Sequence, residues 1–191
     1  MKIKETYKTK EKIMNNSLTE EQVKVLNMSQ SVINEVRKVI IGKDEIIIKV
    51  LLSILAGGHI LIEDIPGVGK TTLAVALSKA LSLDYKRLQF TPDVLPTDVT
   101  GFTILNKETH KFEYKQGAAL TNLFLADEIN RTSSKTQSAL LEVMEEGKVT
   151  VDGITHKMPD PYIVIATQNP VGSIGCLLYT SPSPRDGLLS R

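Results

Sequence analysis

The sequence predicts an α/β fold, a doubly wound parallel sheet with helices on both faces. Short apolar runs bounded by turn residues alternate with segments of helical periodicity, which is the pattern of buried parallel strands joined by crossover helices. The chain has 191 residues, of which 41% are hydrophobic and 24% charged. This is enough for one globular domain, and the composition excludes a globally disordered or fibrous chain.

Charge, cysteine content and the apolar stretches of the sequence argue against several classes of protein. Lys and Arg number 23 against 22 Asp and Glu, so we expect no broad basic surface and no nucleic-acid partner. The single Cys excludes an internal disulfide framework. The longest apolar stretch, residues 46–62, is interrupted by Lys49 and Gly57, and the N-terminus lacks the apolar core of a secretory signal. We therefore expect a cytoplasmic protein without a membrane span.

Both ends of the chain differ in composition from its middle. Residues 1–16 are rich in Lys and Glu and are expected to form a flexible charged tail. Residues 176–186 have the sequence CLLYTSPSPRD, which resembles the in-frame translation of a common sequencing adapter. A genuine Ser/Pro-rich linker is the alternative. We therefore expect residues 17–175 to form the folded domain and residues 176–191 to be a non-native tail.

Two helices are expected before the first strand. The run Ser17–Glu20 has the spacing of a capping box, and Gly42 ends the periodic segment that follows. The apolar residues expected on the buried face of this helix are Leu26, Ile33, Val36 and Ile40. A second helix is expected from Glu45 to Ala56, with Asp44 as its cap.

The rest of the domain supplies the sheet, its crossover helices and two inserted hairpins. Buried strands are expected at residues 59–62, 85–90, 122–126 and 162–166. Helices are expected over residues 71–83, with Leu73, Leu77 and Leu81 on one face, and over residues 134–146. The hairpins pair residues 102–105 with 111–115, and residues 149–151 with 154–157 around Asp152-Gly153.

A phosphate-binding loop is predicted between the first strand and the helix after it. The residues expected to contact a nucleotide are Pro66, Gly67, Val68, Gly69, Lys70, Thr71 and Thr72. Glycines let backbone N–H groups surround phosphate oxygens, Lys70 adds a positive charge, and the Thr71 hydroxyl can ligate Mg²⁺. The full pattern has Gly where this chain has Asp64, a residue type that tolerates left-handed backbone. A Gly-rich turn without a ligand is the alternative.

Polar residues follow two later strands. Asp127 and Glu128 end an apolar strand, where carboxylates are costly unless they have a use. We expect Asp127 to hold Mg²⁺, usually through water, and Glu128 to polarise the water that attacks the γ-phosphate. The alternative for such a pair is a helix cap. Thr167 and Asn169 follow the last strand, and the Asn169 amide is expected to orient that water or contact the γ-phosphate.

These motifs, in this order, resemble an AAA+ ATPase of the MoxR family over residues 30–175. The similar runs are ILIEDIPGVGKTTLA at 60–74, LQFTPDVLPTDVTG at 88–101, LADEINRTSSKTQSALLEVMEEGKVTVDG at 125–153 and VIATQNPVGSIG at 164–175. The resemblance implies a P-loop NTPase core that binds ATP and Mg²⁺. It also implies that Gly67–Thr71 is Walker A, that Asp127 and Glu128 are Walker B, and that Asn169 is sensor 1. The two hairpins would then be the helix-two insert and the pre-sensor-1 hairpin.

The resemblance also carries expectations about assembly. It implies a homo-oligomeric ring, commonly a hexamer, with chaperone-like remodelling of protein complexes and often a von Willebrand A-domain partner. The family's helical lid, sensor 2 and arginine finger would lie after residue 175, so none of these is assigned here. Arg131 matches the family motif and is expected at a subunit interface or the nucleotide, with a solvated surface Arg as the alternative.

Other functions remain open on the sequence. A ring subunit could bind ATP without hydrolysing it, and Asp64 leaves room for that. A DNA-linked or magnesium-chelatase-like relative with the same insert is a further alternative. The three histidines, His59, His110 and His156, lack the spacing of metal ligands and are expected to be ordinary packing or surface residues.

Overall fold

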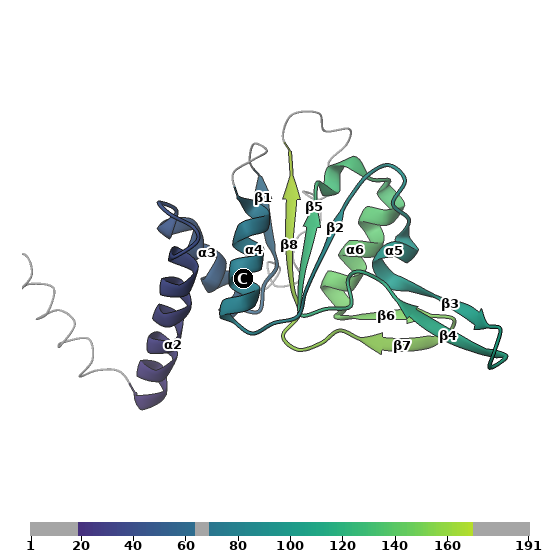
Figure 1. The fold of residues 1–191 in the computed structure, drawn as a ribbon, viewed down its shortest axis with the longest axis horizontal. Coiled ribbons are helices and arrows are strands. Elements are labelled where there is room, and N and C mark those ends of the chain that lie inside the picture. Colours follow the sequence, from purple (N-terminus) through teal and green to yellow (C-terminus); the bar gives the residue numbers. More distant parts are fainter. Residues whose placement is uncertain (1–18, 64–68, 170–191) are drawn as a thin grey trace, which may run out of the picture.

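A computed structural model describes residues 19–63 and 69–169 of the chain. Its main sheet is parallel, with the strand order β1-β8-β5-β2 (Figure 1). These strands are β1 (Ile60–Glu63), β2 (Tyr85–Gln89), β5 (Leu123–Asp127) and β8 (Ile163–Gln168). All four predicted strands are therefore present, within one or two residues of their expected bounds.

Helices cover both faces of this sheet, as the sequence predicts (Figure 1). On one side lie α2 (Glu20–Arg37), α3 (Asp44–Leu55) and α4 (Lys70–Ala80). On the other lie α5 (Pro96–Thr100) and α6 (Ser134–Glu146), which follows a short 3₁₀ helix, η1 (Ile129–Arg131). No described helix has the length and apolarity that a membrane crossing requires.

The apolar pattern of the central strand β5 explains why helices cover both faces of the sheet. Leu123 and Leu125 of β5 pack with the α2–α4 side, whereas Phe124 and Ala126 pack with the α5–α6 side. All four side chains are fully buried. Because successive residues of a strand point to opposite faces, an unbroken apolar run fits only a sheet that is covered twice. The apolar strand patterns thus lead to the observed layers.

Both predicted hairpins are antiparallel and extend beyond the α5–α6 side of the sheet (Figure 1). The first pairs β3 (Gly101–Asn106) with β4 (Lys111–Gln116), and the second pairs β6 (Lys148–Val151) with β7 (Ile154–Lys157). Asp152 and Gly153 have φ angles of 49° and 79°, the conformation that the predicted two-residue turn requires. The two hairpins meet where the Tyr114 ring stacks on His156, with centroids 3.7 Å apart.

Several local predictions need correction. The cap of α2 is Thr19, which forms a capping box with Gln22, and Ser17 lies outside the described residues. Asp44 is the first residue of α3 rather than its cap, and the cap position is Lys43. The α2 helix also ends at Arg37, before Gly42, because a turn separates them. These shifts change the helix ends and leave the fold as predicted.

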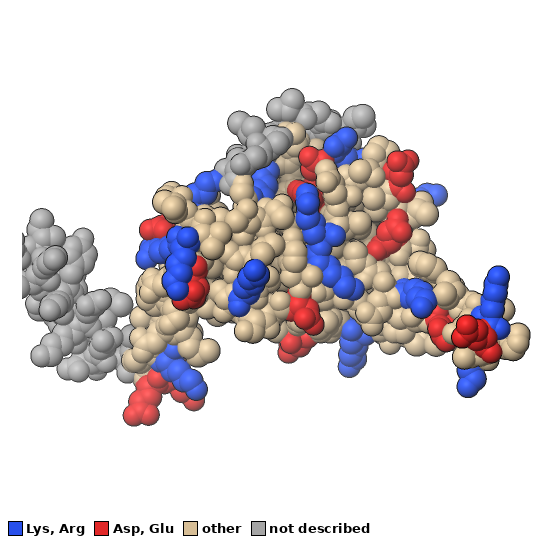
Figure 2. Space-filling model, in the orientation of Figure 1, with Lys and Arg blue, Asp and Glu red and all other residues tan. Residues whose placement is uncertain are grey.

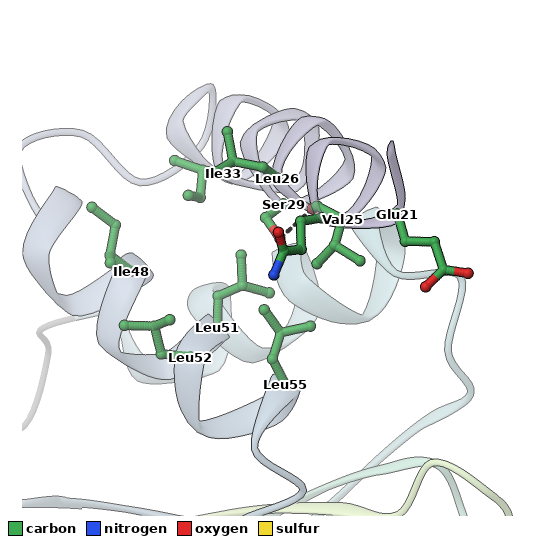
Figure 3. A pocket seen from close by; sticks show the side chains of 10 residues that line it. Glu21, Val25, Leu26, Ser29, Ile33, Ile48, Leu51, Leu52 and Leu55 are labelled. Atoms are coloured by element: carbon green, nitrogen blue, oxygen red, sulfur yellow. Dashed lines mark hydrogen bonds between the residues drawn. The ribbon is translucent and has the colours of Figure 1, made fainter. Parts of the chain in front are cut away.

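Leu26 is the one residue of the predicted α2 face that the structure leaves exposed, at 48% of its surface, while Val36 is fully buried. Leu26 lies on an apolar groove between α2 and α3, together with Val25, Leu52 and Leu55 (Figure 3). The groove has a volume of about 500 Å³. The apolar side chains in the first turns of α2 are therefore only partly covered by the rest of the described fold.

Candidate active site

Polar side chains end the strands of the main sheet at one edge. The register pairs Glu63 of β1 with Gln168 of β8, and Gln89 of β2 with Asp127 of β5. The Gln168 amide donates to the Glu63 carboxylate. Ligands of open α/β sheets bind outside the carboxyl ends of the strands, so this edge is the candidate site.

Asp127 is held firmly by two partners. Its Oδ1 accepts a hydrogen bond of 2.5 Å from the Thr167 hydroxyl, and its Oδ2 lies 2.7 Å from Nη2 of Arg87. The Asp127 side chain is 16% exposed, whereas Thr167 is almost fully buried. One strand on each side of β5 therefore fixes this carboxylate, and its remaining exposure faces the sheet edge.

Glu128 leaves the strand with an unusual backbone. Its φ and ψ angles are 58° and 47°, in the left-handed region that non-glycine residues seldom adopt. Its N–H donates to the Thr167 hydroxyl at 3.0 Å, so Thr167 holds both acidic residues. The Glu128 Oε2 accepts from Arg131 at 2.7 Å and from Gln89 at 3.4 Å. A strained backbone that surrounding contacts hold in place is common at functional sites.

Lys70 is the first residue of α4, which begins at the same edge of the sheet (Figure 1). Gly69 before it has a φ angle of 84°, a left-handed conformation that favours glycine. Thr71 is in the first turn, where backbone N–H groups and the helix dipole favour anions, and Thr72 is exposed. Gly69 and Lys70 also border a small hollow of about 30 Å³, which Ile40 lines as well.

The described residues do not include all of the predicted nucleotide-binding loop. Pro66, Gly67, Val68 and the unusual Asp64 lie outside the described residues. Asn169 directly follows β8, at the predicted edge, and its backbone oxygen accepts from the Asn130 amide at 2.9 Å. The structure thus gathers the described members of the predicted site at one end of the sheet.

Sequence reasoning missed two residues of this site. Arg87 and Gln89 on β2 contact the carboxylates of Asp127 and Glu128, respectively. Gln89 follows the signal that identified Asp127, which is a polar residue at the carboxyl end of a predicted strand, whereas Arg87 lies in the middle of β2 and has no such signal. Their contacts depend on β2 lying beside β5, and that neighbour relation is not visible in the sequence.

His59 and His156 have packing roles, and His110 is exposed in the turn between β3 and β4. His59 accepts a hydrogen bond from the Val164 N–H at Nδ1, at 3.0 Å, and its Nε2 lies 2.9 Å from the Met144 carbonyl oxygen. These contacts require the neutral ring with its proton on Nε2, and they join β8 to the last turns of α6. His156 stacks on Tyr114, and burial raises the pKa of that tyrosine.

A parallel sheet with an acidic strand end, facing a helix that begins with Lys-Thr, is typical of a P-loop ATPase. Comparison with known proteins agrees. The family described as "ATPase family associated with various cellular activities (AAA)" matches residues 59–185. The chain belongs to this family and is MoxR-like, which confirms the resemblance noted in its motifs.

Three similar proteins illustrate this membership. The chain is 58% identical to the uncharacterized protein YeaC of Bacillus subtilis over 73% of its length, and 42% identical to Chaperone MoxR1 of Mycobacterium tuberculosis over 81%. A crystal structure of a Cytophaga hutchinsonii protein has 45% identity and a TM-score of 0.70, covering 84% of this chain and 47% of that one. The chain spans 43% of YeaC and 41% of MoxR1, less than half of each relative.

Proposed function

We propose that this chain forms the ATP-binding and ATP-hydrolysing core of a chaperone-like AAA ATPase that remodels or matures partner protein complexes. The observation that carries the proposal is the acidic pair Asp127–Glu128, held by Thr167 at the edge where α4 begins with Lys70. Partly buried carboxylates and a strained backbone at a strand end are costly to maintain, and phosphate chemistry uses both.

The donor set suits a Mg²⁺-bound triphosphate. Hydroxyl and carboxylate oxygens are the ligands that Mg²⁺ prefers, and Thr71 and Asp127 offer one of each. Bound Mg²⁺ would neutralise the charge that develops on the β- and γ-phosphates. Lys70 and the N–H groups at the start of α4 would bind those phosphates, with Pro66, Gly67, Val68 and Gly69 shaping the loop and Thr72 at its rim.

Two further side chains have proposed roles in hydrolysis. The Glu128 carboxylate would orient the attacking water and draw its proton, because Glu128 directly follows Asp127, the proposed metal ligand that ends β5. The Asn169 side chain, at the end of the neighbouring strand, would hold that water or the γ-phosphate. Both roles require the side chains to reach the same phosphate, which their common sheet edge supports.

The chaperone-like role rests on the relatives. The similar protein from M. tuberculosis is named Chaperone MoxR1, and AAA proteins typically act as oligomers. We therefore propose a homo-oligomeric ring, as in related hexamers, that engages a protein partner such as one with a von Willebrand A domain. The face in Figure 2 has Lys and Arg interspersed with Asp and Glu, which favours a protein client over nucleic acid.

Mutants of the full-length protein test the enzymatic part of the proposal. Glu128→Gln should bind ATP like the unaltered protein but release phosphate at least about a hundredfold more slowly, the typical contribution of a general base. Lys70→Ala should lose ATP affinity. Glu145→Gln and Lys79→Ala, exposed substitutions on α6 and α4, are matched controls.

A second candidate function, ATP binding without hydrolysis, has one observation in its favour. Both carboxylates of the acidic pair are engaged by arginines, Asp127 by Arg87 and Glu128 by Arg131. Steady-state phosphate release decides between the two functions. Release that does not exceed the rate of the Lys70→Ala variant, in protein that binds ATP, would favour the non-hydrolysing module and contradict our proposal.

A further inference from the structure

Asn130 of η1 joins the residue that follows β8 to the segment that follows β5. Its side-chain amide donates to the Asn169 backbone oxygen at 2.9 Å. The backbone ladder between β5 and β8 ends at Ala126 and Ala166, so this contact lies beyond the last paired residues of the two strands. The Asn130 amide therefore connects two chain segments at the sheet edge where the candidate site lies.

The Asn130 end of this contact is fixed in the fold. Asn130 is 9% exposed, and its neighbour Ile129 is 2% exposed within the core on the α5–α6 side. The Glu128 N–H, two residues before Asn130, is held by the buried Thr167 hydroxyl at 3.0 Å. Asn169 is only half-buried and directly follows β8. The contact thus places the backbone of Asn169 relative to an anchored segment that includes Glu128.

The other polar atom of the Asn130 side chain indicates that stability alone does not explain this residue. Its Oδ1 is buried and has no hydrogen-bond partner among the described residues. A buried polar atom without a partner is costly, and an apolar side chain of the same shape would avoid that cost. The contribution of Asn130 therefore lies in the bond that its amide nitrogen donates to Asn169.

We propose that Asn130 is a positioning residue that sets the backbone of Asn169, and thereby the distance between the Asn169 side chain and Glu128. The inference rests on the proposed function, in which the Asn169 side chain holds the attacking water or the γ-phosphate. Removing the Asn130 amide should leave ATP binding intact, because the proposed phosphate contacts come from the start of α4. It should slow hydrolysis, because a displacement of about 1 Å at a reacting centre can cost about a hundredfold in rate.

Steady-state kinetics and urea unfolding of the full-length protein test this role together. Asn130→Leu keeps nearly the same shape and removes both the donor and the unpaired Oδ1. Its kcat should fall about 10- to 100-fold, with unchanged affinity for a non-hydrolysable ATP analogue and an unchanged urea midpoint. A residue that only supports the fold would lose stability and activity together. Asn130→Ala removes the same amide by truncation and should show the same kinetic loss, which keeps the test open if Asn130→Leu does not fold.

The chain offers a matched control at the opposite end of the same two strands. The Asn122 amide, just before β5, donates to the Pro161 backbone oxygen at 3.0 Å. Asn122→Leu therefore removes the same kind of bond between the segments that lead into β5 and β8, away from the candidate site. Its kcat should equal that of the unaltered protein. A loss as large as that of Asn130→Leu would mean that any loosening of these strands slows turnover, and would overturn the positioning role.

A double-mutant cycle shows whether Asn130 acts through Asn169. Asn169→Ala removes the side chain but keeps the backbone oxygen that Asn130 contacts. In that background, Asn130→Leu should cause no further loss of kcat, because the side chain that it positions is already absent. Losses that multiply would mean that the two residues act independently, and would overturn the inference.

The outcomes separate this inference from the function on which it rests. If Asn169→Ala hydrolyses ATP at the starting rate, the proposed role of Asn169 in hydrolysis is wrong. If Asn169→Ala is slow but Asn130→Leu and Asn130→Ala turn over at the starting rate, the role of Asn169 stands and the positioning role of Asn130 is wrong. A reduced affinity of Asn130→Leu for the ATP analogue would also contradict the positioning role.

Discussion

Replacing Thr167 with Val removes one hydroxyl and retains almost the same shape, and we expect a large loss of stability. This hydroxyl donates to Asp127 Oδ1 at 2.5 Å and accepts from the Glu128 N–H at 3.0 Å. Thr167 is 1% exposed, so water cannot take the place of the hydroxyl. The substitution leaves a carboxylate oxygen and a backbone N–H without this partner.

The expected magnitude follows from these two contacts. A hydrogen bond to a charged group contributes about 1.5–3 kcal/mol, and an unsatisfied buried N–H costs about 1–3 kcal/mol. Asp127 keeps Arg87 and some exposure to solvent, so we expect a total loss of about 2–4 kcal/mol in the free energy of unfolding. Thr167→Ser keeps the hydroxyl, loses one methyl group, and should cost about 1 kcal/mol.

Urea unfolding followed by far-UV circular dichroism measures this difference, since the chain contains no Trp to serve as a fluorescent probe. Thr167→Val should unfold at a clearly lower urea concentration than Thr167→Ser. If the two variants agree within about 0.5 kcal/mol, the typical effect of a surface substitution, Thr167 does not tie the acidic pair together as described.

Three further predictions concern the scaffold. Gly117→Ala should destabilise the fold by about 1–3 kcal/mol or more in urea unfolding, because its Cβ would overlap the backbone of Val99 and Gly101; an unchanged midpoint would contradict this. His59→Phe should cost about 2 kcal/mol by losing contacts to Met144 and Val164, and wild-type stability would refute that role. Burial raises the pKa of Tyr162, whose hydroxyl has no hydrogen-bond partner among the described residues, so the folded state keeps its proton when the unfolded chain ionises. The free energy of unfolding should therefore fall as pH rises above about 10, and it should fall less in Tyr162→Phe. At neutral pH this variant should be at least as stable as the unaltered protein. If the two proteins lose the same stability at high pH, this explanation is wrong.

The sheet could be predicted because its signals are local. Four apolar runs of strand length, separated by helical segments, leave few arrangements other than a parallel sheet covered on both faces. The Asp152-Gly153 turn was predictable for a similar reason, since few residues adopt the backbone it needs. The site residues at strand ends followed once the strands were placed.

Other features depend on which of two overlapping motifs forms, on elements too short to give a pattern, or on contacts between residues far apart in the sequence. Ser17–Glu20 and Thr19–Gln22 both have capping-box spacing, and sequence alone does not decide between overlapping boxes. The five-residue helix α5 is too short for a periodic signal. Arg87 contacts Asp127 forty residues away, which requires β2 to be the neighbour of β5. Helix periodicity shows that the Leu26 face is apolar but not what covers it.

The central claim is that Lys70, Thr71 and Asp127 meet at one metal-bound triphosphate. A crystal structure of the full-length protein with a non-hydrolysable ATP analogue and Mn²⁺, located by its anomalous signal, tests it most directly. We predict Mn²⁺ between the Thr71 hydroxyl and Asp127, with the terminal phosphates at Lys70. Phosphates or Mn²⁺ bound away from this sheet edge would contradict the account.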